Sequence, residues 1–395
     1  MQRSNINPGL WACFLIVCGI ILMSTMGCIS SYSDRPARGV EEEDRIISLD
    51  LDLTSNRLAV ILENGMISIR NATDLTLTYQ FEYHNVTNEG EIARWMPLDG
   101  NQLVAWSPSG KYLATSGGNQ TVRIWHPSNW TIVTTLTLNA TKPINTVAWS
   151  PEGGRIAVSS LYRMAVWNTT NWSMERFFKG KSYEGISWDP INPRLAAMTS
   201  LGDEITLWNI TTWEVVVSSR NVTDTRGIIV WSPDGSMMGM GQFPHNVVVL
   251  STDDFQPIAT LKGHPSSVLD LAWSSDGQFL ASSSWGWGDM QPERRDPLRV
   301  WEISSWDEAN VMNGDYPVSA VVWDGEDQDL ITGCYDGKIR VWDADKDYGR
   351  NFTFMEMIAS LILGIVVLVI VVRGYRNLSN TRKLEWNLLL ESKNK

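Results

Sequence analysis

The sequence has little of the chemistry from which catalytic and metal sites are built. Its 395 residues include only four cysteines and four histidines, and no two cysteines stand at CxxC spacing. No pair of histidines has the spacing of metal ligands. A glycine-rich phosphate loop, a nucleophile elbow and a cysteine–histidine arrangement are all missing from the sequence. We therefore expect no cofactor, no metal and no enzymatic activity.

Positive charge is also scarce. Only 19% of the residues are charged, and the formal net charge is −12. Proteins that bind nucleic acid gain affinity from lysine and arginine side chains that neutralise phosphates. The sequence therefore predicts no nucleic-acid partner and a solvated acidic surface.

Tryptophan is abundant, with 20 residues, and most of them recur with a period of about 40 residues, the range of repeat proteins. The first tryptophan of each repeat ends an apolar run, at Trp106, Trp149, Trp188, Trp231, Trp273 and Trp323. A second position follows, occupied by Trp125, Trp167, Trp208, Leu250, Trp301 and Trp342. A third stands five residues later, at Trp130, Trp172, Trp213, Phe255 and Trp306. A degenerate first copy fits the same spacing with Leu51, Arg70 and Leu75.

Each repeat contains four short apolar runs separated by turn residues, which predicts four strands. In the first copy these are Ile46–Asp52, Arg57–Leu62, Met66–Arg70 and Leu75–Phe81. A sheet of this size cannot bury both of its faces alone, but sheets stacked radially cover one another. The sequence therefore predicts an all-β protein, a seven-bladed propeller over residues 46–353.

These residues resemble the WD-repeat propeller family. The run Asp336–Asp343 (DGKIRVWD) is close to that family's best-kept motif, and Val268–Gly277 matches its first strand and turn. The family's Gly-His pair survives once, as Gly263-His264. The resemblance implies a buried polar tetrad in one blade, formed by His264, Ser283, Asp296 and Trp301. The other six blades lack the histidine, so we expect tryptophan and aliphatic packing to replace it.

Ring closure is left open by the sequence. The seventh copy has three clear strands, and residues near Val40 or near Phe352 are the two candidates for its fourth. Residues 29–45 are expected to be a linker, and the charge run Glu41–Asp44 within it is expected to be solvated.

Residues 1–28 have the pattern of a targeting segment, because Arg3 is the only charge before Asp34 and Leu10–Met23 is almost wholly apolar. Three outcomes fit this pattern: cleavage before Cys28, lipidation of Cys28, or retention as an anchor.

A second apolar segment, residues 354–372, predicts a single-pass transmembrane helix; a buried soluble helix is the alternative. Residues 373–395 form a basic tail with four cations close to the span: Arg373, Arg376, Arg382 and Lys383. The positive-inside rule then predicts a cytoplasmic tail and a propeller on the outer side of the cell membrane.

Sequons for N-glycosylation are frequent. The candidates before the span are Asn71, Asn85, Asn119, Asn129, Asn139, Asn168, Asn171, Asn209 and Asn221, with Asn351 nearly at the membrane and Asn377 beyond it. Many of them follow a predicted third strand, where asparagine and threonine also suit a turn. Both explanations remain open at this point.

The sixth repeat has an insertion between its second and third strands, Ser284–Pro297. It combines aromatic and arginine residues typical of binding hot spots, at Trp285, Trp287, Arg294 and Arg295. We expect either a partner site there or a tryptophan pair folded back onto its own blade.

The sequence therefore predicts a membrane-tethered propeller that binds protein or polysaccharide partners without catalysis. One alternative is a cytosol-facing propeller on a C-terminal anchor that recruits a partner such as a small GTPase. The other is an outer-side enzyme that uses paired acids in the central pore. Fold alone does not decide among them.

Overall fold

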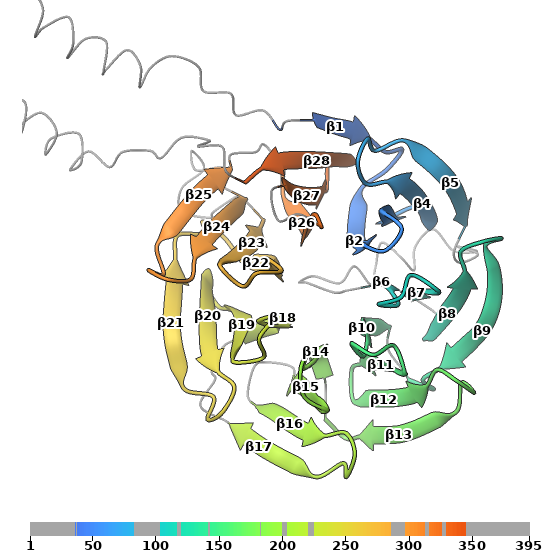
Figure 1. Cartoon of the computed structure of the whole chain (residues 1–395), viewed down its shortest axis with the longest axis vertical. Coiled ribbons are helices and arrows are strands. Elements are labelled where there is room, and N and C mark those ends of the chain that lie inside the picture. Colours follow the sequence, from blue (N-terminus) through green and yellow to red (C-terminus); the bar gives the residue numbers. More distant parts are fainter. Residues whose placement is uncertain are drawn as a thin grey trace, which may run out of the picture. The chain divides into compact units, whose positions relative to one another are not determined.

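A computed structural model describes residue 36 and residues 38–82, 103–116, 120–140, 143–181, 183–199, 204–219, 225–285, 297–312, 316–325 and 329–344. In this part of the chain the regular secondary structure is strand throughout. The strands form seven antiparallel sheets of four strands each. Figure 1 shows these sheets arranged as the blades of a ring, which confirms the predicted seven-bladed propeller.

Six blades consist of four strands that follow one another in sequence. Blade one contains β2 (Ile46–Asp52), β3 (Arg57–Leu62), β4 (Met66–Asn71) and β5 (Leu77–Glu82). Blade two contains β6 (Val104–Trp106), β7 (Leu113–Ser116), β8 (Thr121–His126) and β9 (Thr131–Thr137). Blade three contains β10 (Ile144–Trp149), β11 (Arg155–Ser160), β12 (Arg163–Asn168) and β13 (Met174–Lys179). Blade four contains β14 (Tyr183–Trp188), β15 (Arg194–Thr199), β16 (Ile205–Asn209) and β17 (Val215–Ser219).

Blade five contains β18 (Thr225–Trp231), β19 (Met237–Gln242), β20 (Asn246–Ser251) and β21 (Pro257–Lys262). Blade six contains β22 (Val268–Trp273), β23 (Phe279–Ser284), β24 (Leu298–Glu302) and β25 (Glu308–Met312). Blade seven contains β26 (Val318–Trp323), β27 (Asp329–Cys334), β28 (Lys338–Asp343) and the N-terminal strand β1 (Arg38–Glu41).

The ring is closed by a strand from the start of the propeller. β1 pairs antiparallel with β28, and Val40 stands opposite Ile339. Of the two candidates for this strand, the residues near Val40 therefore fill the place. Closure by an early segment completes the last blade and leaves few exposed sheet edges inside the ring.

The prediction of a solvated charge run is wrong for Glu42. Its side chain is buried beside β4, where Arg70 Nε donates to Glu42 Oε1 at 2.6 Å and Ser68 Oγ donates to Glu42 Oε2 at 3.0 Å. Arg70 occupies the position that holds tryptophan in most other blades. A buried guanidinium requires a counter-ion, and the segment between β1 and β2 supplies it.

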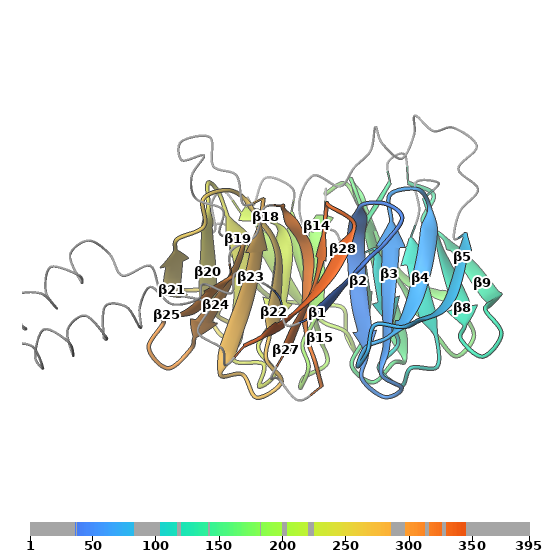
Figure 2. The ribbon, with the colours of Figure 1, turned by 90° about the horizontal axis from the view of Figure 1, so that it is seen from above.

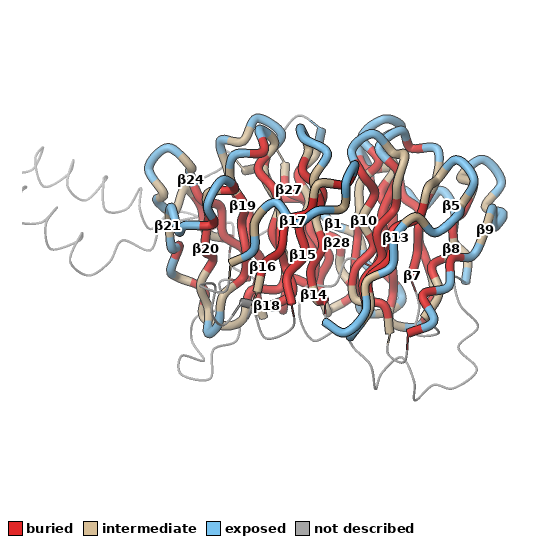
Figure 3. Tube along the Cα trace, turned by 90° about the horizontal axis from the view of Figure 1, so that it is seen from below, coloured by how far each residue is buried: buried red, intermediate tan, exposed pale blue. Residues whose placement is uncertain are grey.

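The core lies between neighbouring blades, because each sheet buries both of its faces. The third strands β4, β12 and β20 are buried over their four central residues. One apolar cluster joins Ala114 and Ile124 of blade two to Val147 and Ile156 of blade three. Figure 3 shows burial concentrated in the strands and exposure in the turns and along the outermost strands.

The first tryptophan of a repeat links its blade to the preceding blade by a hydrogen bond. The indole Nε1 of Trp149 donates to the carbonyl oxygen of Ala105 at 3.0 Å, and that of Trp188 donates to Ala148 O at 3.0 Å. Trp231, Trp273 and Trp323 make the equivalent bonds to Ser187, Val230 and Ala272. In every case the acceptor is the residue just before the first tryptophan of the previous blade, so the bond recurs with the repeat.

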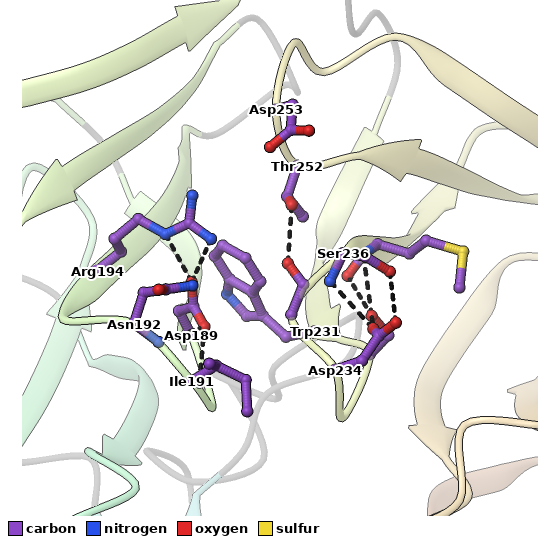
Figure 4. Close-up of polar contacts among 12 residues, drawn as sticks. Asp189, Ile191, Asn192, Arg194, Trp231, Asp234, Ser236, Thr252 and Asp253 are labelled. Atoms are coloured by element: carbon purple, nitrogen blue, oxygen red, sulfur yellow. Dashed lines mark hydrogen bonds and ion pairs between the residues drawn. The ribbon is translucent and has the colours of Figure 1, made fainter.

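A side chain from the start of the second strand covers the same tryptophan. In blade four Arg194 pairs with Asp189 at 2.5 Å and lies over the Trp231 ring, 5.2 Å from its centroid (Figure 4). Blade one repeats this arrangement with Arg57 over Trp106 at 4.4 Å. Such cation–π contacts add a favourable electrostatic interaction between neighbouring blades.

The third tryptophan of each repeat occupies an unusual backbone conformation. Trp130, Trp213 and Trp306 have φ values of 54°, 61° and 61°, in the left-handed region. The Trp130 amide donates to His126 O at 2.8 Å, which closes the turn before the outer strand. A non-glycine residue in this conformation costs about 1–2 kcal/mol, and packing of the ring offsets that cost, as in Trp130, which contacts Tyr79 and Phe81 of the preceding blade.

Antiparallel order gives the ring two different faces, and Figure 2 shows the strands running between them. One face carries the turns that join first to second and third to fourth strands; we call it the Asn face, after its asparagines. The other carries the turns that join second to third strands and the connections between blades; we call it the Trp285 face.

Candidate partner-binding face

The predicted tetrad of blade six is present in part, with one residue corrected. His264 Nε2 lies 2.6 Å from Ser282 Oγ, and Trp301 Nε1 donates to the same oxygen at 2.8 Å. The serine between the two rings is therefore Ser282, and the prediction of Ser283 is wrong. Side chains alternate across a strand, so a shift of one residue moves the hydroxyl to the opposite face. Asp296 lies outside the described residues.

Two further blades keep half of this network. Trp125 Nε1 donates to Thr115 Oγ1 at 2.8 Å, and Trp342 Nε1 donates to Thr332 Oγ1 at 3.0 Å. Thr115, Ser282 and Thr332 all stand nine residues after the first tryptophan of their repeats. Alignment of the repeats on that tryptophan would have identified Ser282. Polar support is thus retained in three blades, where we expected apolar packing in all but one.

The insertion of blade six begins with a well-anchored tryptophan. The ring of Trp285 stacks on Tyr335 of blade seven, with centroids 5.1 Å apart and planes 3° from parallel. The Trp285 amide donates to Ser267 O at 3.2 Å, and the Tyr335 amide donates to Pro317 O at 3.1 Å. Trp285 therefore bridges two blades and does not fold back onto its own. Trp287, Arg294 and Arg295, the other predicted binding residues, lie outside the described residues.

Trp285 belongs to a series that the sequence prediction missed. Phe243, Trp285 and Tyr335 each stand twelve residues after the first tryptophan of blades five, six and seven, Trp231, Trp273 and Trp323. Blades one to four hold Glu63, Gly118, Leu161 and Ser200 at that position. We call Phe243, Trp285 and Tyr335 the aromatic arc. The sequence contains this pattern, an aromatic residue twelve positions after the first tryptophan, but it becomes visible only when the blades are compared position by position.

Two aromatic side chains at or near the aromatic arc are exposed to solvent. Phe243 is 52% exposed, and Tyr316, in the connection that leads into blade seven, is 46% exposed. Trp285 and Tyr335 are half-buried against each other. Rigid aromatic rings that bury a large area at low entropic cost are the usual anchors of protein interfaces. The arc can therefore act as a preformed contact surface.

Two carboxylates on the innermost strands are used to join blades. Asp50 Oδ2 accepts the Trp106 amide at 2.6 Å, and Asp270 Oδ2 accepts the Val321 amide at 2.9 Å. Burial raises the pKa of Asp50 to about 7, and the nearby charge of Asp52 adds to the effect. Burial likewise raises the pKa of Asp270 to about 7, with a contribution from the charge of Asp50. Within the described ranges no cluster of three or more histidine, cysteine or acidic side chains suits a metal ion.

The sequon asparagines in the described ranges mostly sit in turns on the Asn face. Asn71, Asn168 and Asn209 end the third strands of blades one, three and four. Asn129 Oδ1 accepts the Thr131 hydroxyl at 2.8 Å, and Asn171 Oδ1 accepts the Ser173 hydroxyl at 2.8 Å. The turn chemistry expected of these residues is confirmed, and it does not conflict with modification. Asn139 follows β9 on the Trp285 face, whereas Asn85, Asn119, Asn221 and Cys28 lie outside the described residues.

Comparison with known proteins agrees with this geometry. The family described as "WD domain, G-beta repeat" matches residues 103–126, 255–287 and 307–343. The chain is a seven-bladed β-propeller with WD-type repeats in these three stretches. Propellers of this family generally serve as non-catalytic scaffolds that hold protein partners.

The relatives share only parts of the chain. Protein HIR1 of Cryptococcus neoformans is 27% identical over 192 residues, which cover 46% of this chain and 19% of the relative. THO complex subunit 3 of Arabidopsis thaliana is 24% identical over 227 residues, covering 54% of this chain and 68% of the relative. A ciliary WD repeat-containing protein of Euplotoides octocarinatus is 41% identical over 54 residues, 14% of this chain and 8% of that protein. This chain thus spans about a fifth of the length of the HIR1 relative.

Membrane segments are not visible in the described ranges. The part of the chain that the structure describes contains no helix long and apolar enough to span a bilayer. The apolar stretches at residues 1–28 and 354–372 lie outside the described residues, as does the basic tail.

Proposed function

We propose that this WD-repeat propeller is a non-catalytic platform that holds a protein partner against the aromatic arc. The observation that carries the proposal is the recurrence of an aromatic side chain at one position of three consecutive blades. Because Phe243, Trp285 and Tyr335 occupy the same position in three neighbouring blades, they lie on the same face of the ring, where one partner can contact all three.

The rigidity of the arc supports this role. The backbone at Trp285 and at Tyr335 is fixed by hydrogen bonds to the connections that precede their blades. The two rings are already stacked at 5.1 Å. A partner therefore orders few side chains on docking, which lowers the entropic cost of association.

The platform is proposed to be tethered to a membrane by residues 354–372, with the propeller outside and residues 373–395 in the cytoplasm. The support for this part is the apolar run, the basic residues that follow it and the N-terminal targeting pattern. An outward-facing propeller also gives a use to the sequons in blades one to four.

Capture of partners from intact cells tests the binding face. Full-length protein with Trp285→Ala and Tyr335→Ala should lose most of its captured partners, while its melting temperature changes little. Tyr162→Ala is the matched control, because Tyr162 is a 55% exposed aromatic residue on the same face but in blade three. Equal loss with Tyr162→Ala, or no loss with the arc variant, would reject the arc as the contact surface.

The same capture distinguishes the class of partner. Treating the captured material with protease should remove the binding activity if the partner is a protein. If binding survives protease and is lost on treatment with polysaccharide hydrolases, the partner is a glycan and the protein proposal fails.

Topology is tested separately by protease added to intact cells. The expected result is that the propeller is digested while the tail beyond Lys383 is spared. A protected propeller would instead favour the cytosol-facing platform.

A further inference from the structure

The outer strands of blades one to four expose an apolar band. Of fourteen large hydrophobic side chains that are exposed in the described ranges, nine lie on outer strands, and eight of these belong to blades one to four. They are Leu77 and Tyr79 on β5, Ile132 and Val133 on β9, Met174 and Phe177 on β13, and Val215 and Val216 on β17. Only Ile258 on β21 extends the band to blade five.

Two of these strands lack the usual protection of a sheet edge. β9 has the sequence TIVTTLT and β17 has VVVSS, and neither contains a charged residue or a proline. An outermost strand presents unpaired backbone groups to solvent, and proteins normally guard such edges with charge, proline or a covering element. The outer strands of blades five to seven follow that rule, since each carries a charge: Lys262 on β21, Glu308 on β25, and Arg38 and Glu41 on β1.

The sequons follow the same division. The six sequon asparagines in the described ranges are Asn71, Asn129, Asn139, Asn168, Asn171 and Asn209, and all adjoin the outer strands of blades one to four. None of the described residues of blades five to seven is a sequon asparagine. Asn129 and Asn139 stand at the two ends of the uncharged strand β9, and Asn209 precedes the uncharged strand β17.

Local contacts bring the sequons onto the apolar band. Trp130, the middle residue of the Asn129 sequon, stacks on Tyr79 of the neighbouring outer strand at 5.5 Å and 11°. Trp172, the middle residue of the Asn171 sequon, packs edge-on against Tyr112 at 5.4 Å. The turn that carries Asn129 is thereby fixed beside Tyr79 of the apolar band, and the turn that carries Asn171 is fixed against Tyr112 of blade two.

We propose that N-linked oligosaccharides on these asparagines cover the outer strands of blades one to four and leave blades five to seven as the bare docking sector. This inference rests on the proposed outward-facing topology. In the modification, the Asn Nδ2 atom bonds the anomeric carbon of a diphosphate-activated oligosaccharide donor and releases one proton. The lipid diphosphate leaves with the electron pair of the broken carbon–oxygen bond, so no oxidant or reductant takes part.

The sequon asparagines differ in how accessible their side-chain amides are for modification. Asn129, Asn139 and Asn171 are exposed. The amide Nδ2 of Asn168 is already engaged, because it donates to Glu175 Oε1 at 2.9 Å, and Glu175 also accepts Arg155 Nε at 2.7 Å. Asn168 and Asn171 stand three residues apart, so one bulky sugar obstructs the other. The structure thus favours Asn171 over Asn168.

Peptide mapping of the full chain, purified from cells that perform N-glycosylation, tests the modification. Sugar is expected on Asn129, Asn139 and Asn171, and Asn129→Gln and Asn171→Gln should each remove one glycan from the intact mass. Asn64→Gln is the matched control, because Asn64 Oδ1 accepts the Met66 amide at 3.0 Å in a similar turn that is not a sequon. Loss of a glycan from the intact mass with Asn64→Gln would mean that the assay does not report sequon occupancy and would overturn the assignment.

The covering role has its own test. Enzymatic removal of the sugars under native conditions should produce self-association, measured by sedimentation velocity. Val133→Lys combined with Val216→Lys should abolish that self-association, because charge then guards the edges of β9 and β17. Deglycosylated protein that stays monomeric would overturn the covering role, even with every site occupied.

Failure of this inference can be told apart from failure of the proposed topology. Bare asparagines on a propeller that protease still removes from intact cells would overturn the sugar cover and leave the outward-facing platform intact. Bare asparagines on a protected propeller would overturn both.

Discussion

Blades one to four and blades five to seven share an interior and differ in their exterior. In both sectors a first-strand tryptophan donates to the preceding blade, as Trp188 does in blade four and Trp323 in blade seven. The outer strands of blades one to four expose large apolar side chains and lie beside sequons, and two of them, β9 and β17, carry no charge, whereas every outer strand of blades five to seven carries at least one charge. The aromatic arc belongs only to the second sector. Packing between blades thus keeps residue types similar at the positions that touch a neighbouring blade. At positions that face solvent, residue types differ between the two sectors and can serve different functions.

The largest effect is expected from the shared interior, and it should be the same in both sectors. Trp167 in blade three and Trp301 in blade six are 4% and 3% exposed. Replacing either by alanine should lower the free energy of unfolding by about 3–5 kcal/mol, through lost burial and the cavity left behind. Chemical denaturation of the two variants measures this. A loss of unfolding free energy in only one of the two variants would show that the blades do not contribute equally to stability.

The junction between the two sectors should be nearly as sensitive. Glu42→Ala leaves the buried Arg70 guanidinium without its counter-ion, and removal of one partner of a buried pair typically costs about 3–5 kcal/mol. Arg45→Ala is the control, because Arg45 is 55% exposed and its pair with Glu63 is long, at 3.6 Å. That variant should change the melting temperature very little. Similar losses for both variants would mean that Glu42 does not hold the ring closed.

The innermost strands should make stability depend on pH. The pKa of Asp50 and of Asp270 is raised to about 7 in the folded chain, against an ordinary value of 3.8. The folded state therefore prefers the protonated carboxyls, and their stabilising contribution, complete at low pH, is lost as the pH rises from about 4 through 7. Asp270→Asn should raise the free energy of unfolding at pH 8 by up to about 4 kcal/mol, since one pKa unit corresponds to about 1.4 kcal/mol, and leave it nearly unchanged at pH 4. Melting curves across this range give the answer, and an equal change at both pH values would contradict it.

The smallest effect on stability is expected at the aromatic arc. Trp285→Ala removes one stacked pair, worth about 0.5–1.5 kcal/mol, and the ring is not part of the core. Thermal unfolding should therefore shift by only a few degrees while partner capture collapses. A loss of stability as large as that of Trp301→Ala would show that Trp285 is a core residue and not part of a separate contact surface.

Much of the interior could be predicted from sequence because it repeats. Tryptophan spacing located the blades, and the strands Ile46–Asp52 and Arg57–Leu62 were predicted to the residue. Ring closure could not be decided, since pairing between β1 and β28 joins segments far apart in the chain and leaves no local pattern.

Single-residue detail at the candidate site was harder to predict. Ser282 and Ser283 are adjacent residues of the same type. They differ only in the face of the strand that they occupy, and this face determines which serine joins the tetrad. Glu42 looked like one member of an acidic run, and its burial depends on Arg70 in another strand. The aromatic arc was missed because its members stand in three different blades, so no single stretch of sequence contains the pattern.

The most direct test of the contrast between the sectors is site-specific photocrosslinking in cells. A photoreactive amino acid replaces Phe243, which is 52% exposed on the arc, or Val133, which is 40% exposed on β9. We predict crosslinks to a partner protein from position 243 and none from position 133. Partner crosslinks from position 133 alone would contradict it, because the docking surface would then lie on the outer strands of blades one to four.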